Sequence, residues 1–261
     1  MKNRHGFQAI GIVIIITVVA LIGVAAFFVI DGNNKATDYN NYDFNTIIKA
    51  DQHTGNIADH VKGNPDAPVL IFEYADFQCP GCASINPKVN KALEELDGKL
   101  AIVYRNFLLA YHKNGTAAAS AAEAAGLQVD ENGKSYWKPY ADKLFASQAE
   151  WESSTGSERT ALFEKYFNDV TKGKGDLEKF RQDIAGEDVS QKISFDMGIA
   201  RRIDIPSTPA FYIDGQYIKW NEAGELNING KTIAWEEARS GDQFIELLKE
   251  IVEAKTNENS K

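Results

Sequence analysis

The chain of 261 residues contains two cysteines, and only Pro80 and Gly81 separate them. The segment EYADFQCPGC ends at Cys82 and continues an apolar run that predicts a buried strand. A strand, a short turn and a helix in this order would place Cys79 at the helix start, where unpaired backbone N–H groups and the positive end of the helix dipole favour a thiolate. Pro80 fits the first helical turn because no N–H donor is needed there.

Three roles are open to such a pair: a structural clip, part of a metal site, or a reversible redox couple. A disulfide that closes so short a loop removes little entropy from the unfolded chain. A zinc site typically needs about four ligands, and the sequence has no second cysteine pair. The histidines lack the paired spacing of ligands and stand at His5, His53, His60 and His112. We therefore expect reversible redox chemistry, with the clip and an intermolecular metal site as alternatives.

The N-terminal segment predicts the compartment. Residues 8–30 carry no charged side chain, and their apolar stretch would span roughly 33 Å as a helix, enough for a bilayer core of ~30 Å. Lys2 and Arg4 precede it, so the positive-inside tendency keeps the N-terminus in the cytoplasm and exports the rest. A cleaved signal peptide is the alternative, with small residues at 24–26, but the run exceeds a signal core of about 7 to 15 residues. We expect an uncleaved single-pass anchor in the cell membrane.

The exported part is acidic and large enough to fold without disulfides. The chain has 28 basic and 37 acidic residues, so removing Lys2 and Arg4 leaves 26 against 37, a formal net charge of −11. Nucleic acid requires a basic face, and we expect no nucleic acid as a partner. A chain of about 230 residues buries most of its apolar surface, so the cysteines are not needed for bulk stability.

An α/β pattern surrounds the cysteines. Residues 69–77 and 99–109 are apolar runs typical of buried strands, and residues 84–98 between them have helical spacing. This strand–helix–strand unit is the start of a parallel pair. Later, PAFYIDG and QYIKW meet around residues 214–215, which predicts a hairpin. Residues 241–254 predict an amphipathic helix.

Two segments interrupt this pattern. Residues 31–45 are polar and rich in asparagine, which predicts a tether between membrane and domain. Residues 114–203 lose the strand signals and carry alanine-rich and aromatic stretches with helical spacing. We therefore predict a helical block inserted in the α/β core, with aromatic residues forming a core of its own.

These motifs together resemble a known family. EYADFQCPGC after a strand, a helix that contains Pro87, and a late STPAFYIDG resemble the thioredoxin-fold thiol:disulfide oxidoreductases. The helical block, with RNFLLAYH at its entrance and SYWKPYADKLFASQAEW inside it, resembles the DsbA-like branch. The resemblance covers about residues 55–252. It departs at residues 216–239, where the family passes quickly to the last helix, so we expect either an added hairpin beside the active face or a decoration of the sheet edge.

The resemblance implies an α/β thioredoxin fold with an inserted helical domain, preceded by one transmembrane helix. The predicted organisation is as follows: residues 1–30 cytoplasmic N-terminus and anchor, 31–54 tether, 55–113 first half of the thioredoxin fold, 114–203 inserted helical domain, 204–255 second half, and 256–261 tail.

The resemblance also assigns roles to the residues of the CPGC motif and of the STP motif. It implies that Cys79 is the nucleophile and Cys82 the resolving thiol, supported by the intervening Pro80 and Gly81. Thr208-Pro209 matches the family's cis-proline loop, along which a substrate backbone would lie as an added strand, although an ordinary trans proline is the alternative.

Three further polar residues flank these motifs. Glu73 matches the family's buried acid, and its apolar neighbours favour a buried, proton-relaying carboxyl over one on an exposed strand face. We expect Asp76 to be a strand-end residue and His112 to begin a helix, and we assign neither any chemistry.

The function implied by the resemblance is the introduction of disulfides into exported proteins through Cys79 and Cys82. The expected substrates are unfolded exported proteins with free cysteines. We expect no cofactor, because the sequence has no flavin or nicotinamide motif, and the family implies reoxidation by a membrane partner linked to quinone. Redox poise decides direction, so an isomerase or a reductase stays open, as does a tethered, non-catalytic module that binds unfolded chains.

Overall fold

The computed structural model describes residues 37–218, 224–228, 230–235 and 243–257. A compact unit begins at Tyr39 and contains the elements described below. The expected anchor, residues 8–30, lies outside the described residues, and the described helices include none with the length and apolarity to cross a bilayer. The anchor therefore stays a prediction.

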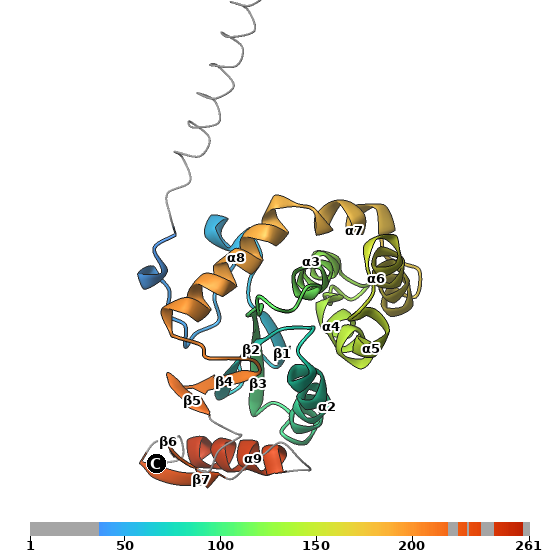
Figure 1. Cartoon of the computed structure of the whole chain (residues 1–261). Helices are drawn as coiled ribbons and strands as arrows, with labels where there is room; N and C mark the ends of the chain where they lie inside the picture. The colour runs from blue at the N-terminus through green and yellow to red at the C-terminus, as the bar shows by residue number, and fades with distance from the viewer. Residues whose placement is uncertain (1–36, 219–223, 229, 236–242, 258–261) are drawn as a thin grey trace, which may run out of the picture. The chain divides into compact units, whose positions relative to one another are not determined.

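A five-stranded mixed sheet lies at the centre of this unit (Figure 1). Its strands, in the order β1-β3-β2-β4-β5, are β1 His60–Gly63, β3 Leu100–Asn106, β2 Val69–Ala75, β4 Ala210–Ile213 and β5 Gln216–Ile218. β2 and β3 are parallel, with Glu73 opposite Tyr104, while β1 is antiparallel to β3 and β4 is antiparallel to β2. The predicted parallel pair is confirmed, and β1 is an addition that the sequence patterns did not indicate.

Helices cover both faces of the sheet, because its side chains alternate. Val69 and Ile71 point to the face where α2 (Pro80–Glu95) and α9 (Gln243–Thr256) pack. On α2 the predicted apolar side is buried, at Ile85, Val89 and Ala92. Phe72 and Tyr74 point to the opposite face, where α8 (Glu187–Arg202) packs.

Helices α3 to α8 lie between β3 and β4 in the chain, where the helical block is predicted. They are α3 Gly115–Gly126, α4 Trp137–Ala146, α5 Gln148–Trp151, α6 Gly156–Thr171, α7 Leu177–Ile184 and α8. Aromatic side chains of α4 and α6 share one apolar cluster with Phe77, Cys79 and Cys82. α8 differs from the rest, because its Phe195 and Ile199 pack on the sheet. The prediction that the block has a core of its own is therefore wrong, because its core is continuous with the surroundings of the two cysteines.

The tether predicted over residues 31–54 is wrong from Tyr39 onward. Two short 3₁₀ turns, η1 (Tyr39–Asn41) and η2 (Gln52–Thr54), lie in this segment, which packs against α8 and the sheet. The rings of Tyr39 and Tyr42 lie 5.7 and 4.7 Å from the ring of Phe195. Tyr39 also fits against Gly198, where an added Cβ would overlap its ring. The polar composition concealed these aromatic anchors, which bury apolar surface although their neighbours are asparagines.

The C-terminal part contains the predicted hairpin and an added one. β4 and β5 are antiparallel and join at Asp214 and Gly215, whose φ angles of 48° and 74° match a tight hairpin turn. Within the extra segment 216–239, β6 (Gly224–Ile228) and β7 (Lys231–Trp235) form a separate two-stranded antiparallel sheet beside α9 (Figure 1). The segment therefore adds a hairpin.

Candidate active site

Cys79 lies at the start of α2, as the sequence predicts. It is the N-cap residue, Pro80 takes the first helical position, and the Cys79 N–H donates to the Asp76 carbonyl at 3.0 Å. Both cysteines are free thiols in this structure, 7% of Cys79 is exposed, and Cys82 is fully buried. The two sulfurs therefore differ in access to a reaction partner.

The two thiols also differ in acidity. A hydrogen bond from the Cys82 thiol lowers the pKa of Cys79 most, and hydrogen bonding with Thr208 and the backbone N–H groups of Cys82 and Gly81 outweighs burial, so this pKa is about 5. Burial raises the pKa of Cys82 well above its usual value, and the nearby Cys79 and Glu73 raise it further. One sulfur is a stabilised thiolate at neutral pH, and the other keeps its proton.

The structure brings Thr208 and Pro209 to the cysteines. The Thr208–Pro209 peptide bond is cis, as expected, and the Cys79 Sγ lies 3.3 Å from the Thr208 carbonyl oxygen, to which the protonated thiol donates. A Cβ added to Gly81 would lie 3.1 Å from Pro209 Cδ and 3.6 Å from Cys79 Sγ. Glycine at position 81 thus permits the proline loop to approach the thiol closely.

Glu73 lies fully buried on β2, and the alternative of an exposed strand face is wrong. Its Oε2 accepts a hydrogen bond from Lys62 Nζ at 3.2 Å, while its Oε1 has no hydrogen-bond partner among the described residues. Lys62 comes from β1 and is also fully buried. The sequence analysis did not identify Lys62. The one local signal of its burial is its place beside the apolar Val61 in the short segment HVKG.

Asp76 has a larger role than a strand-end residue. Its carboxylate is fully buried and accepts hydrogen bonds from the Gln78 N–H at 2.8 Å, the Leu109 N–H at 2.9 Å and His112 Nδ1 at 2.8 Å. His112 does not begin a helix, because α3 starts at Gly115. The pair instead joins the turn before Cys79 to the loop that follows β3.

The helical block holds the two residues that precede Cys79. Gln148 Nε2 donates to the Phe77 carbonyl at 2.7 Å, and Gln78 Nε2 donates to the Glu152 carbonyl at 2.9 Å. The Asn114 N–H donates to Gln78 Oε1 at 2.6 Å. These contacts join residues up to 74 positions apart, so no local pattern could have indicated them.

The described residues include no group of three or more histidine, cysteine, aspartate or glutamate side chains arranged to hold a metal ion.

Comparison with known proteins places the fold. A thioredoxin family model matches residues 55–226. A probable disulfide bond formation protein D from Bacillus anthracis is 27% identical over 82% of this chain and 91% of its own length. An Na⁺/H⁺ antiporter NhaA 1 from Mycolicibacterium gilvum is 32% identical over 60% of this chain, which covers only 24% of that protein. The chain thus spans about a quarter of the length of such antiporters.

Solved structures agree with this fold. BdbD from Bacillus subtilis in its oxidised form aligns with a TM-score of 0.55 and 21% identity, over 82% of this chain and all of that one. Alpha-DsbA1 from Wolbachia pipientis aligns with a TM-score of 0.54 and 22% identity, over 77% of this chain and 94% of that one. The match over residues 55–226 and the sheet with its cysteines at a helix start show that the chain belongs to the thioredoxin family.

Proposed function

We propose that this protein is a thiol:disulfide oxidoreductase of the DsbA/thioredoxin type that introduces disulfides into exported proteins. The observation that carries the proposal is the asymmetry of the two sulfurs. Cys79 has a pKa of about 5 at a helix start, whereas Cys82 is buried with a raised pKa. A stable thiolate is a good leaving group, so a mixed disulfide at Cys79 breaks in the direction that leaves the substrate oxidised.

The reaction starts from the Cys79–Cys82 disulfide. A substrate thiolate attacks the Cys79 sulfur, the bond between the cysteines breaks, and Cys82 leaves with the electron pair. The Cys82 thiolate then takes a proton, and we assign Glu73 as the buried carboxyl that exchanges this proton. A second substrate thiolate attacks the substrate sulfur of the mixed disulfide and expels Cys79 as a thiolate. Two substrate thiols are oxidised, and one enzyme disulfide is reduced.

The substrates we propose are unfolded exported proteins with free cysteines. The backbone of such a chain would lie along Thr208 beside Pro209, within reach of the Cys79 sulfur. Main-chain hydrogen bonding of this kind tolerates many sequences, which suits an enzyme that acts on varied chains.

Reoxidation and location complete the proposal. A membrane partner linked to quinone would return Cys79 and Cys82 to the disulfide, with no cofactor bound to this chain.

Residues 8–30 would anchor the protein in the cell membrane with its cysteines outside the cytoplasm. Alkaline carbonate extraction tests the anchor: the intact protein should stay with membranes, and release of a form that begins near residue 27 would contradict it.

Trapping of mixed disulfides tests the chemistry. With a reduced, unfolded substrate protein, Cys82→Ser should accumulate mixed disulfides through Cys79, because no resolving thiol remains. Cys79→Ser should accumulate few, and the double serine variant none. The oxidised wild type should form substrate disulfides under the same conditions. Equal trapping by both single variants, or substrate binding that survives in the double variant without any oxidation by wild type, would overturn the proposal.

A further inference from the structure

We propose that Asp142, on α4 of the helical block, is a positioning residue for the buried Lys62–Glu73 pair. This inference rests on the proposed function, because the pair serves the proton exchange of Cys82 in that reaction. It extends the active site into a helix that contributes neither sulfur.

A chain of hydrogen bonds leads from Glu73 to the surface. Lys62 Nζ donates to Glu73 Oε2 at 3.2 Å and to Asn86 Oδ1 at 3.0 Å. Asn86 Nδ2 donates to Asp142 Oδ1 at 2.9 Å, and Lys138 Nζ donates to Asp142 Oδ2 at 2.7 Å. Lys62 and Glu73 are fully buried, whereas the side chains of Asp142 and Lys138 are 27% and 43% exposed. The buried pair is therefore linked, contact by contact, to the solvent.

Asp142 fixes the direction of the Asn86 amide. An ionised carboxylate only accepts hydrogen bonds, so Asn86 must turn its NH₂ group toward Asp142 and its oxygen toward Lys62. Burial raises the pKa of Asp142, but hydrogen bonds from Asn90, Lys138 and Asn86 outweigh burial and lower it. Asp142 is thus an anion at neutral pH. Without it, the amide could turn its NH₂ group against the ammonium and leave Lys62 one acceptor short.

α4 also forms much of the remaining surroundings of Lys62. The ammonium lies 5.4 Å from the ring of Tyr104, 5.9 Å from that of Trp137 and 6.0 Å from that of Phe145. Trp137 and Phe145 belong to α4. A buried ammonium is stabilised by such rings and by its acceptors together, so the helical block holds the cation that balances Glu73.

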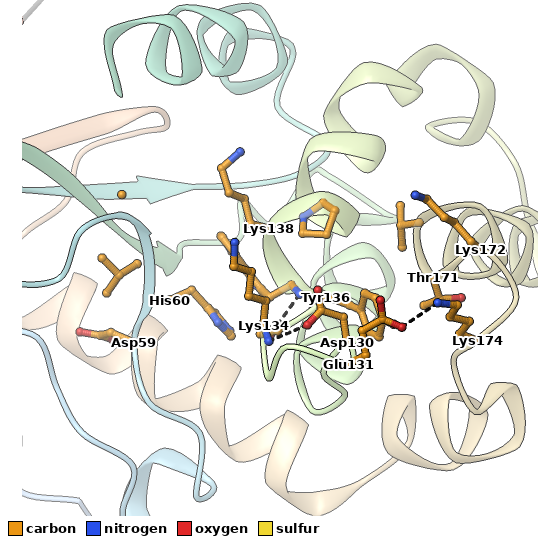
Figure 2. Close-up of a pocket in the computed structure, with 16 residues that line it drawn as sticks. Asp59, His60, Asp130, Glu131, Lys134, Tyr136, Lys138, Thr171, Lys172 and Lys174 are labelled. Atoms are coloured by element: carbon orange, nitrogen blue, oxygen red, sulfur yellow. Dashed lines mark hydrogen bonds and ion pairs between the residues drawn. The ribbon is translucent and has the colours of Figure 1, made fainter. Parts of the chain in front are cut away.

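The outer end of this series of hydrogen bonds lies in a solvent-accessible pocket. Lys138 lines a cavity of about 730 Å³ together with His60 and Lys134 (Figure 2). Lys138 and Asn90 also line a neighbouring cavity of about 420 Å³. The link from Glu73 therefore ends where water has access.

The groups around Cys82 set the sign of the expected effect. Cys79 and Glu73 raise the pKa of Cys82 beyond the effect of burial, and a backbone hydrogen bond with Asp76 lowers it. Burial raises the pKa of Tyr104 on β3, and the charges of Cys82, Glu73, Asp76 and Glu123 raise it further. Lys62 is the cation paired with Glu73. If Lys62 is held less firmly, the charge of Glu73 is less well balanced and Cys82 loses its proton less readily. Loss of Asp142 should therefore slow the attack of Cys82 on a mixed disulfide.

The test uses the mixed disulfide of Cys79 with thionitrobenzoate. Attack by Cys82 releases the coloured thiolate, and stopped-flow absorbance gives its rate as a function of pH. Asp142→Leu should slow release about three- to tenfold, a shift of the pH profile by about 0.5 to 1 unit to higher pH, the effect of one hydrogen bond. Asp142→Asn should give a smaller shift than Asp142→Leu, because its oxygen can still accept from Asn86 but its NH₂ group no longer fixes the direction of the Asn86 amide.

Asp169→Leu is the matched control. Asp169 pairs with Lys165 on α6 as Asp142 pairs with Lys138 on α4, but its side chain is 47% exposed. This variant should leave the profile unchanged. If Asp142→Leu does not fold, Asn86→Leu cuts the same link and should give the same shift.

Two results would overturn the inference: a profile unchanged in both Asp142→Leu and Asn86→Leu, or an equal shift in Asp169→Leu. Alkylation of Cys79 in the reduced protein should keep its pH dependence in every variant, and a parallel change there would also contradict it. Failure of the proposed function looks different, because the oxidised wild type would then form no substrate disulfides in the trapping assay.

Discussion

At Cys79, several hydrogen bonds converge on one sulfur atom. The hydrogen bond from the Cys82 thiol lowers the pKa of Cys79 most. Burial opposes this effect, and Thr208 and backbone N–H groups of the first helical turn lower the pKa further. Gly81 contributes one of these N–H groups while leaving room for Pro209. The acidity of Cys79 is therefore built from short-range donors, and the removal of a single donor should have a measurable effect.

The alkylation rate of Cys79 tests this account. The rate of modification by iodoacetamide should follow a titration with a midpoint near pH 5, because only the thiolate reacts and Cys82 is buried. Cys82→Ala should move the midpoint upward toward the ordinary value of about 8.5, since it removes the largest cause. Mass spectrometry identifies the modified residue. A wild-type midpoint above about 7, or one that Cys82→Ala leaves in place, would show that other groups control the thiol.

At the scale of elements, buried ions fasten α8 to the sheet. Arg105 of β3 donates to Asp59 Oδ2 at 2.7 Å, and Lys192 of α8 donates to Asp59 Oδ1 at 3.1 Å and to Asp196 Oδ1 at 2.8 Å. All four residues are buried. Burial raises the pKa of Asp59, but Lys192 and Arg105 outweigh burial and lower it to about 2. α8 is thus held by charges as well as by its apolar side chains.

Removal of Lys192 should destabilise this arrangement strongly. Lys192→Met leaves Asp59 and Asp196 buried with less positive charge, which should lower the free energy of unfolding by about 3 to 5 kcal/mol in urea titrations at pH 7. The loss in the free energy of unfolding should be smaller in acid, because protonation of Asp59 and Asp196 removes the unbalanced charge. Lys179→Met, which breaks an exposed pair with Asp183, is the control and should cost about 1 kcal/mol or less. Equal losses in the two variants would contradict the account.

The sequence patterns predicted most elements that carry a strong period or turn signal. β2, β3, α2 and the β4–β5 hairpin lie where the apolar runs and the turn residues indicated them. β1 is only four residues long and places a lysine in the interior, so neither its length nor its period identified it. The packing of residues 39–54 depends on α8 and β3, which are far away in the chain.

For the whole molecule, the low pKa of Cys79 links stability to redox state. A pKa lowered by folding adds stability to the reduced protein; this contribution is complete above the unfolded value of about 8.5 and is lost as pH falls through about 5. The disulfide form has no thiolate and lacks this dependence. In urea titrations, the free energy of unfolding of the reduced form should therefore increase relative to that of the oxidised form as pH rises from about 5 to 8. A constant difference across this range would be inconsistent with a stabilised thiolate.

The candidate site was predictable where one short motif carries it. Cys79 and Cys82, Thr208–Pro209 and Glu73 each lie in or beside such a motif, and the structure gathers them around one helix start. The partners of Glu73 were not predictable, because Lys62, Asn86 and Asp142 meet only when β1, α2 and α4 have packed. Their spacing in the sequence carries no period that a pattern could reveal.

The contact between Cys79 and Thr208 joins residues 129 positions apart, and this has a consequence for the chain while it is being made. A protein emerges N-terminal end first, so Cys79 appears long before Thr208. Until β4 joins the sheet, the thiol lacks a partner that lowers its pKa. The acidity of Cys79 in the finished protein is therefore completed only when segments on both sides of the helical block have met.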